Sequence, residues 1–124
     1  MADKYGKNFE IKFKKDFLNT VKNSTIDRIY DTMNGLYGIS NICDFIGYAY
    51  PNIFYLECKT HKGASIPFDN ITQSSKLIQK VGIPGVRAGV ILWLYEKDKV
   101  FYVPIATIKK MKEDGKKSVG LKAV

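Results

Sequence analysis

The chain has 124 residues, a length that fits one compact domain, because single domains commonly hold about 100–150 residues. Hydrophobic residues make up 45% and charged residues 26%, which excludes a disordered chain and indicates a real core. The net charge of +8 favours a polyanionic partner, with nucleic acid as the first candidate.

Two further features of composition restrict the class of protein. The longest apolar run, residues 90–95, is too short to span a bilayer, and the N-terminus lacks the apolar centre of a signal peptide. We therefore expect a soluble, cytoplasmic protein with no membrane partner. Two cysteines, Cys43 and Cys58, with one histidine exclude a secreted disulfide framework and a four-ligand zinc site. Both thiols are expected to be reduced.

The positive charge is concentrated at the two ends of the chain. Residues 1–22 carry +3 and residues 105–124 carry +4. Eighteen of the twenty cations are lysines, which suit phosphate groups, whereas reading of base edges favours the arginine fork. The composition thus predicts contacts with a nucleic-acid backbone rather than extensive reading of sequence.

The first predicted element is a basic amphipathic helix. Apolar residues recur every four positions from Phe9 to Val21 with lysines between them, and Asn8 is the expected N-cap. Residues 23–41 mix Asn, Ser and Gly with isolated apolar residues. This segment is expected to be an extended arm or irregular loop rather than a helix.

A β-hairpin is predicted over residues 42–50 and 53–60, which are rich in β-branched and aromatic residues. Two registers are open. A loop of Pro51 and Asn52 pairs Tyr50 with Ile53, whereas a loop of Tyr50 and Pro51 moves the pairing by two residues. Either register places the same side chains on each face.

The rest of the chain completes a layered α/β domain. The elements predicted after the hairpin are a loop over residues 61–70, a short helix over 71–80, a turn over 82–85, a buried central strand over 88–95, a strand over 100–103, a basic helix over 104–114 and a flexible basic tail from about 115. This order indicates one domain over residues 1–124, an α/β fold with a mixed sheet flanked by helices.

The predicted hairpin contains two acidic residues in otherwise apolar strands, Asp44 and Glu57. Both registers bring them together with Lys59 on one face. Neighbouring carboxylates repel each other and lose hydration, so the cluster suits a bound cation. Oxygen ligands without His or Cys favour Mg²⁺ or Mn²⁺. Lys59 is then placed to position a water or to stabilise charge on an attacked phosphate.

The alternative for this cluster is purely structural. Asp44 and Lys59 would form a cross-strand ion pair worth about 0–1 kcal/mol, and Glu57 would point to solvent. The apolar neighbours Phe45 and Leu56 favour a site instead, because uncompensated charge is costly in an interior strand.

These residues resemble a known nuclease signature. Asp44 followed by Glu57-Cys58-Lys59 is similar to the PD-(D/E)xK pattern. A wider set of motifs follows the order seen in RecU-type Holliday-junction resolvases: Gly6-Lys7-Asn8-Phe9-Glu10, Ile26-Asp27-Arg28, Cys43-Asp44-Phe45-Ile46 and Gln73. The resemblance extends from about Gly6 to Pro104 and implies a restriction-endonuclease-like fold.

The resemblance also implies roles for individual residues. Glu10, Asp44, Glu57 and the backbone carbonyl of Cys58 would ligate the metal ion, and Lys59 would assist attack by water. Gln73 matches a family glutamine close to the metal. The residues that we expect to contact DNA are Arg28, Lys14, Lys15, Lys62 and Lys76. The short region before Asp44 resembles compact phage-encoded members, which suggests a bacterial or phage origin.

The function expected from the resemblance is metal-dependent resolution of Holliday junctions, with branched DNA as substrate. Symmetric cutting needs two active sites, so a homodimer is expected. One alternative is a restriction-like or repair nuclease acting on linear or flap DNA. Another is a non-catalytic DNA-binding protein, whose binding would fall steeply with salt and which would show no metal-dependent cutting.

Overall fold

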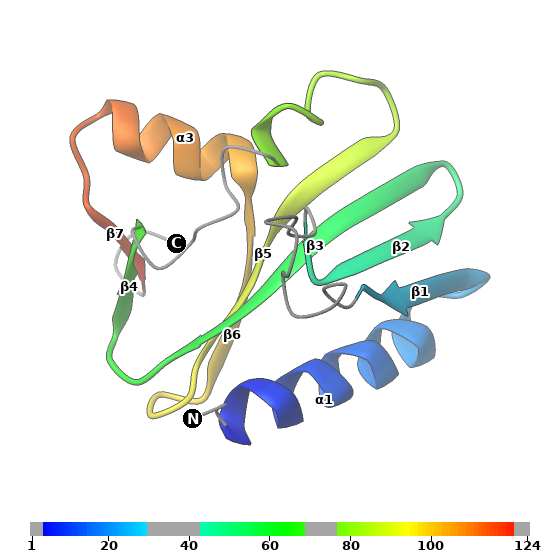
Figure 1. The fold of residues 1–124 in the computed structure, drawn as a ribbon, viewed down its shortest axis with the longest axis horizontal. Helices are drawn as coiled ribbons and strands as arrows, with labels where there is room; N and C mark the ends of the chain where they lie inside the picture. Colours follow the sequence, from blue (N-terminus) through cyan, green and yellow to red (C-terminus); the bar gives the residue numbers. More distant parts are fainter. Residues whose placement is uncertain (1–3, 30–42, 69–76, 121–124) are drawn as a thin grey trace, which may run out of the picture.

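The computed structural model describes residues 4–29, 43–68 and 77–120, which form a sheet with a helix on each side (Figure 1). The elements in chain order are α1 (Lys4–Thr20), β1 (Ser24–Arg28), β2 (Phe45–Ala49), β3 (Asn52–His61), β4 (Ser65–Pro67), β5 (Val86–Leu94), β6 (Lys99–Pro104), α3 (Ile105–Glu113) and β7 (Ser118–Gly120). No helix within these ranges is long and apolar enough to cross a membrane.

The main sheet has the strand order β1-β2-β3-β5-β6. β3 and β5 pair in parallel, and the other neighbours are antiparallel, so the sheet is mixed as predicted. β5 is buried along most of its length, which confirms the apolar run as a strand covered on both faces.

Each face of the sheet has its own core. Val90 and Leu92 of β5 pack with Ile105 and Ile108 of α3 on one face. On the other face, the α1 residue Phe9 belongs to a cluster with five strand residues, Ile26, Phe45, Leu56, Cys58 and Ile91. The two helices therefore cover opposite faces.

The β2–β3 hairpin has the second of the two predicted registers. Ala49 pairs with Asn52 and Ile46 pairs with Tyr55, so the connecting turn is Tyr50-Pro51. The predicted parity is confirmed, because Ile46 and Tyr55 pack against the α3-side core while Phe45 belongs to the α1-side core.

One prediction near the N-terminus needs correction, and a second can now be made definite. α1 begins at Lys4, so Asn8 lies inside the helix and is not its N-cap. The extra turn is stabilised by Tyr5, whose ring stacks on Tyr95 at a centroid distance of 4.2 Å. Residues 23–41 were expected to be an extended arm or irregular loop rather than a helix, and the described part contains the extended strand β1, in which buried Ile26 pairs with Gly47 of β2. Residues 30–42 lie outside the described part.

The predicted loop over residues 61–70 and the predicted flexible tail were also partly wrong. Ser65–Pro67 and Ser118–Gly120 pair as the small sheet β4–β7. Ile66 and Val119 face each other there and are each 1% exposed. Burial of these two side chains outweighs the polar character of the surrounding segments. α3 ends as predicted before Gly115, which has a φ of +87°.

The close approach of β5 and β6 requires Gly89. A Cβ atom there would lie 2.5 Å from Cε1 of Tyr102 and 2.7 Å from the Val103 carbonyl oxygen. We expect Gly89→Ala to lower the free energy of unfolding by about 1–3 kcal/mol, the usual effect of overpacking. Urea denaturation measures this, with Gly63→Ala as the control because no atom lies within 4 Å of a Cβ at Gly63. Equal stability of the two variants would contradict the packing.

Candidate active site

The candidate site lies at the start of β2, where its pairing with β3 ends. The last pair of that ladder is Phe45 with Leu56, and the Asp44 N–H still donates to the Leu56 carbonyl at 3.0 Å. The Cys58 N–H donates to Oδ2 of Asp44 at 2.8 Å. Because the N–H and C=O of a strand residue point to the same side, the Cys58 carbonyl also points toward this end of β2.

Arg28 joins two of the predicted acidic residues on the α1 side of the sheet. Its Nε donates to Oε1 of Glu10 at 2.8 Å, and its Nη2 lies 3.8 Å from Oδ1 of Asp44. The Arg28 guanidinium is 5.8 Å from the ring centroid of Phe45, which fixes its direction. A cation therefore lies between the carboxylates of Glu10 and Asp44.

Glu57 and Lys59 project from the other face. They pair with Val90 and Leu92, which belong to the α3-side core. Glu57 is 3% exposed, and the Lys59 Nζ lies 3.2 Å from its Oε2. A buried carboxylate is costly without a nearby positive charge, so this ion pair offsets part of the burial of Glu57.

This arrangement differs from the structural alternative considered for the hairpin. Lys59 pairs with Glu57 rather than with Asp44, and Glu57 is buried rather than directed to solvent. Asp44 instead interacts with the Cys58 backbone and with Arg28. The predicted common face is confirmed for Glu57 and Lys59. Asp44 was predicted on the same face, but it precedes β2 and its carboxylate contacts the Cys58 N–H and Arg28 on the α1 side.

The charges of these groups act on one buried thiol. Burial is the main cause that raises the pKa of Cys58 well above its ordinary value. Asp44 and then Glu10 raise it further, Arg28 lowers it, and Glu57 also raises it. Burial and the nearby carboxylates thus favour the protonated form of the Cys58 thiol.

The carboxylates do not form one ligand set in this arrangement. Among residues 4–29, 43–68 and 77–120, no group of three or more His, Cys, Asp or Glu side chains is placed to hold a metal ion. The reason is the sheet itself, because Glu10 lies on the α1 side while Glu57 projects from the α3 side. Arg28 balances the charge of Glu10 on one side, and Lys59 balances the charge of Glu57 on the other.

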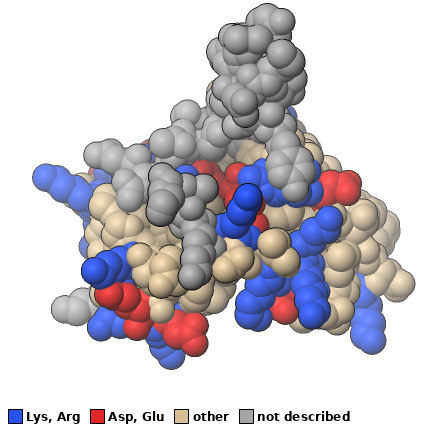
Figure 2. Space-filling view, turned by 60° about the horizontal axis from the view of Figure 1, so that its bottom comes forward, with Lys and Arg blue, Asp and Glu red and all other residues tan. Residues whose placement is uncertain are grey.

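The other predicted residues have different positions. Lys14 and Lys15 are exposed on α1, and exposed Lys62 lies 3.9 Å from Glu96. Figure 2 shows Lys and Arg side chains spread over the face that turns forward there, with acidic side chains among them. Gln73 and Lys76 lie outside the described residues.

Sequence reasoning missed the link between Arg28 and Glu10. Arg28 was expected to contact DNA, but its guanidinium binds a residue 18 positions earlier in the chain. A usable signal was the alternation in β1: Arg28 is two residues after buried Ile26, so both project toward α1.

Comparisons with known proteins give a fold but no sequence family. No protein-family model matches the chain, and no curated protein matches it. One solved structure, Hjc from Archaeoglobus fulgidus, covers 95% of this chain and 90% of its own, with a TM-score of 0.66 and 18% identity. The fold is similar to that of Hjc. Hjc is a Holliday junction resolvase from an archaeal hyperthermophile. Its likeness confirms the predicted fold, a restriction-endonuclease-like mixed sheet in a single domain.

The buried thiols predict a pH dependence of stability. Burial raises the pKa of Cys43 from 9.0 to about 11, and that of Cys58 also lies above 9.0. Between pH 9.0 and about 11 the Cys43 thiol loses its proton in the unfolded chain but keeps it in the folded chain. The contribution of the thiol to the free energy of unfolding is therefore complete below pH 9.0 and is lost as the pH rises.

We expect urea denaturation from roughly pH 8 to pH 10.5 to show a falling free energy of unfolding. The double variant Cys43→Ala/Cys58→Ala should show a shallower fall, because other alkaline groups remain in both proteins. Identical slopes for the parent and the variant would contradict the effect of burial on the thiols.

Proposed function

We propose that the chain is a structure-selective DNA endonuclease that resolves Holliday junctions by divalent-metal-dependent hydrolysis. The main support is the Asp44 carboxylate at the start of β2, which accepts a hydrogen bond from the Cys58 N–H, between Glu57 and Lys59 in β3, and lies near Arg28. A fold similar to that of a known resolvase agrees with this function. The order of motifs further favours a RecU-type enzyme.

The proposed cofactor is Mg²⁺ or Mn²⁺. The resemblance implies Asp44, Glu57, Glu10 and the Cys58 carbonyl as its ligands, and their oxygen atoms are the donors that these hard cations prefer. Because Glu10 and Glu57 lie on opposite sides of the sheet in this structure, binding of one ion by all four groups would require these side chains to move. The ion would supply Lewis-acid stabilisation of the phosphate and a more acidic water. The sulfur of Cys58 takes no part, because its side chain packs in the buried α1-side core.

The protein's own cations have separate proposed tasks. Lys59 holds the Glu57 carboxylate at 3.2 Å and stabilises negative charge on the attacked phosphate. Arg28 orients Glu10 and Asp44 through its guanidinium. Gln73 completes the proposed catalytic set through its resemblance to the family glutamine.

The proposed substrate is branched DNA bound through its backbone. Lys14, Lys15 and Lys62 are exposed and, together with Lys76, would neutralise phosphates without reading bases. Resolution of a four-way junction requires cuts in two strands. A homodimer with two equivalent sites meets this requirement, because a two-fold axis relates both sites to the symmetric junction.

Removal of the Glu57 charge tests the site. We expect Glu57→Gln to lower the rate of cutting an immobile four-way junction in Mg²⁺ by about a thousandfold, since metal-assisted charge stabilisation contributes several kcal/mol. Single-turnover gel assays measure the rate. Glu113→Gln is the matched control, because Glu113 is exposed in the Lys109 ion pair on α3. Cutting by Glu57→Gln at the parent rate would exclude this site.

A comparison of substrates tests the preference for junctions. We expect a four-way junction to be cut faster than a flap or a plain duplex of the same sequence, with no cutting in EDTA. If a flap is preferred, the enzyme is a repair-type nuclease on the same fold. Binding that falls by roughly 10³–10⁵ between 50 and 200 mM salt, without metal-dependent cutting of any substrate, would indicate a DNA-binding protein instead.

A further inference from the structure

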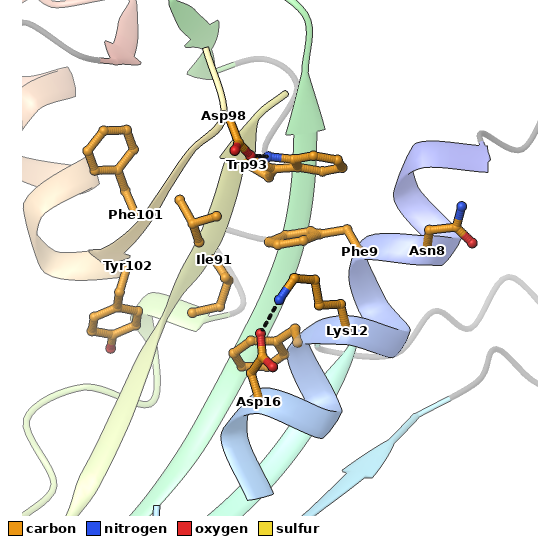
Figure 3. A pocket seen from close by; sticks show the side chains of 11 residues that line it. Asn8, Phe9, Lys12, Asp16, Ile91, Trp93, Asp98, Phe101 and Tyr102 are labelled. Atoms are coloured by element: carbon orange, nitrogen blue, oxygen red, sulfur yellow. Dashed lines mark hydrogen bonds and ion pairs between the residues drawn. The ribbon is translucent and has the colours of Figure 1, made fainter. Parts of the chain in front are cut away.

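An apolar cavity lies on the α1 side of the sheet. Its volume is about 410 Å³, and it opens between α1 and the β5–β6 hairpin. Figure 3 shows Phe9, Lys12 and Asp16 on α1 across from side chains of the sheet. The apolar lining consists of Phe9, Phe13, Ile91, Trp93, Val100, Phe101 and Tyr102. We refer to these seven residues as the β6 groove.

The β6 groove exists because α1 does not cover the whole sheet. α1 packs over β1 and β3, so the α1 side of β6 keeps large apolar side chains in contact with water. Val100 is 57% exposed and Tyr102 is 43% exposed. Adjacent exposed apolar side chains of this size commonly mark a binding surface.

The backbone of β6 indicates which conformation a bound segment would have. β6 is at the edge of the five-stranded sheet, and no described strand pairs with its outer side. Val100 and Tyr102 point to the α1 side, because they pair with Trp93 and Ile91. An added strand would gain main-chain hydrogen bonds from β6, and every second side chain of it would enter the groove.

The charge of the groove argues against nucleic acid as the partner. Its charged lining residues are Lys12, Asp16 and Asp98. Lys12 binds Asp16 at 2.7 Å, and Asp98 accepts a hydrogen bond from the Trp93 Nε1–H at 3.2 Å. The lining is therefore slightly acidic on a chain whose net charge is +8. The groove thus lacks the excess of positive charge that phosphate groups need, and its one unbalanced charge, Asp98, favours a neutral or basic peptide.

We infer that β6 and the β6 groove bind an extended segment of a partner protein. The segment adds to the edge of the sheet as a strand. It carries large apolar side chains at alternate positions and has neutral or basic rather than acidic flanks. No residue of the groove belongs to the proposed catalytic or DNA-binding set.

The test is selection of a phage-displayed library of random linear peptides on the full chain. We expect enrichment of peptides with apolar residues at alternate positions. One enriched peptide, made synthetically, should change the fluorescence of Trp93, the single tryptophan of the chain. It should also slow hydrogen exchange at the amides of β6.

Two matched variants locate the binding. Val100→Lys should weaken the synthetic peptide at least about tenfold, equal to about 1.4 kcal/mol. Ile83→Lys should leave its affinity unchanged, because Ile83 is also 57% exposed but lies outside the groove. Circular dichroism would confirm that both variants are folded. Both should cut a junction as the parent does, so a failure of the nuclease assay would affect only the proposed function.

Several results would overturn the inference. They are the absence of enriched peptides, peptides without alternating apolar residues, or slowed exchange confined to other strands. Equal binding by Val100→Lys and Ile83→Lys would also refute it. If sedimentation showed a dimer that only Val100→Lys dissociates, the groove would belong to a second copy of the chain and the partner segment would be rejected.

Discussion

The hydrogen bond from the Cys58 N–H to the Asp44 carboxylate determines the geometry of the candidate site. It joins the start of β2 to β3 just where their ladder ends. The same carboxylate faces Arg28, which binds Glu10 on α1. Three strands and a helix are thus connected through one acidic side chain. Glu57, next to Cys58 in the chain, is held on the opposite face by the alternation of β3.

The local parts of this arrangement could be predicted from sequence. The alternation of β2 and β3 fixes which side chains share a face, and one of two possible turns gives the observed register. The apolar run of β5 identified a strand covered by helices on both sides. Glu57 and Lys59 could be paired for the same reason, because they are separated by two positions on one strand.

The missed parts depend on contacts between segments far apart in the chain. β4 and β7 have three residues each, too few for a visible alternation, and each is stabilised by burying one apolar residue against the other. The Arg28–Glu10 ion pair depends on where α1 crosses the sheet, which neither local motif specifies. The division of the carboxylates between two faces has the same origin.

The parallel pairing of β3 with β5 has a consequence for folding. The hairpins β2–β3 and β5–β6 consist of strands that follow each other in the chain, so each closes a short loop. The pairing of β3 with β5 joins the two hairpins and closes a much longer loop of chain. Formation of this non-local pairing is therefore the slower step. Glu57 lies in this pairing opposite Val90. Its carboxylate loses its water only when the two halves of the sheet dock, so the electrostatic cost of the site falls on the last stage of assembly.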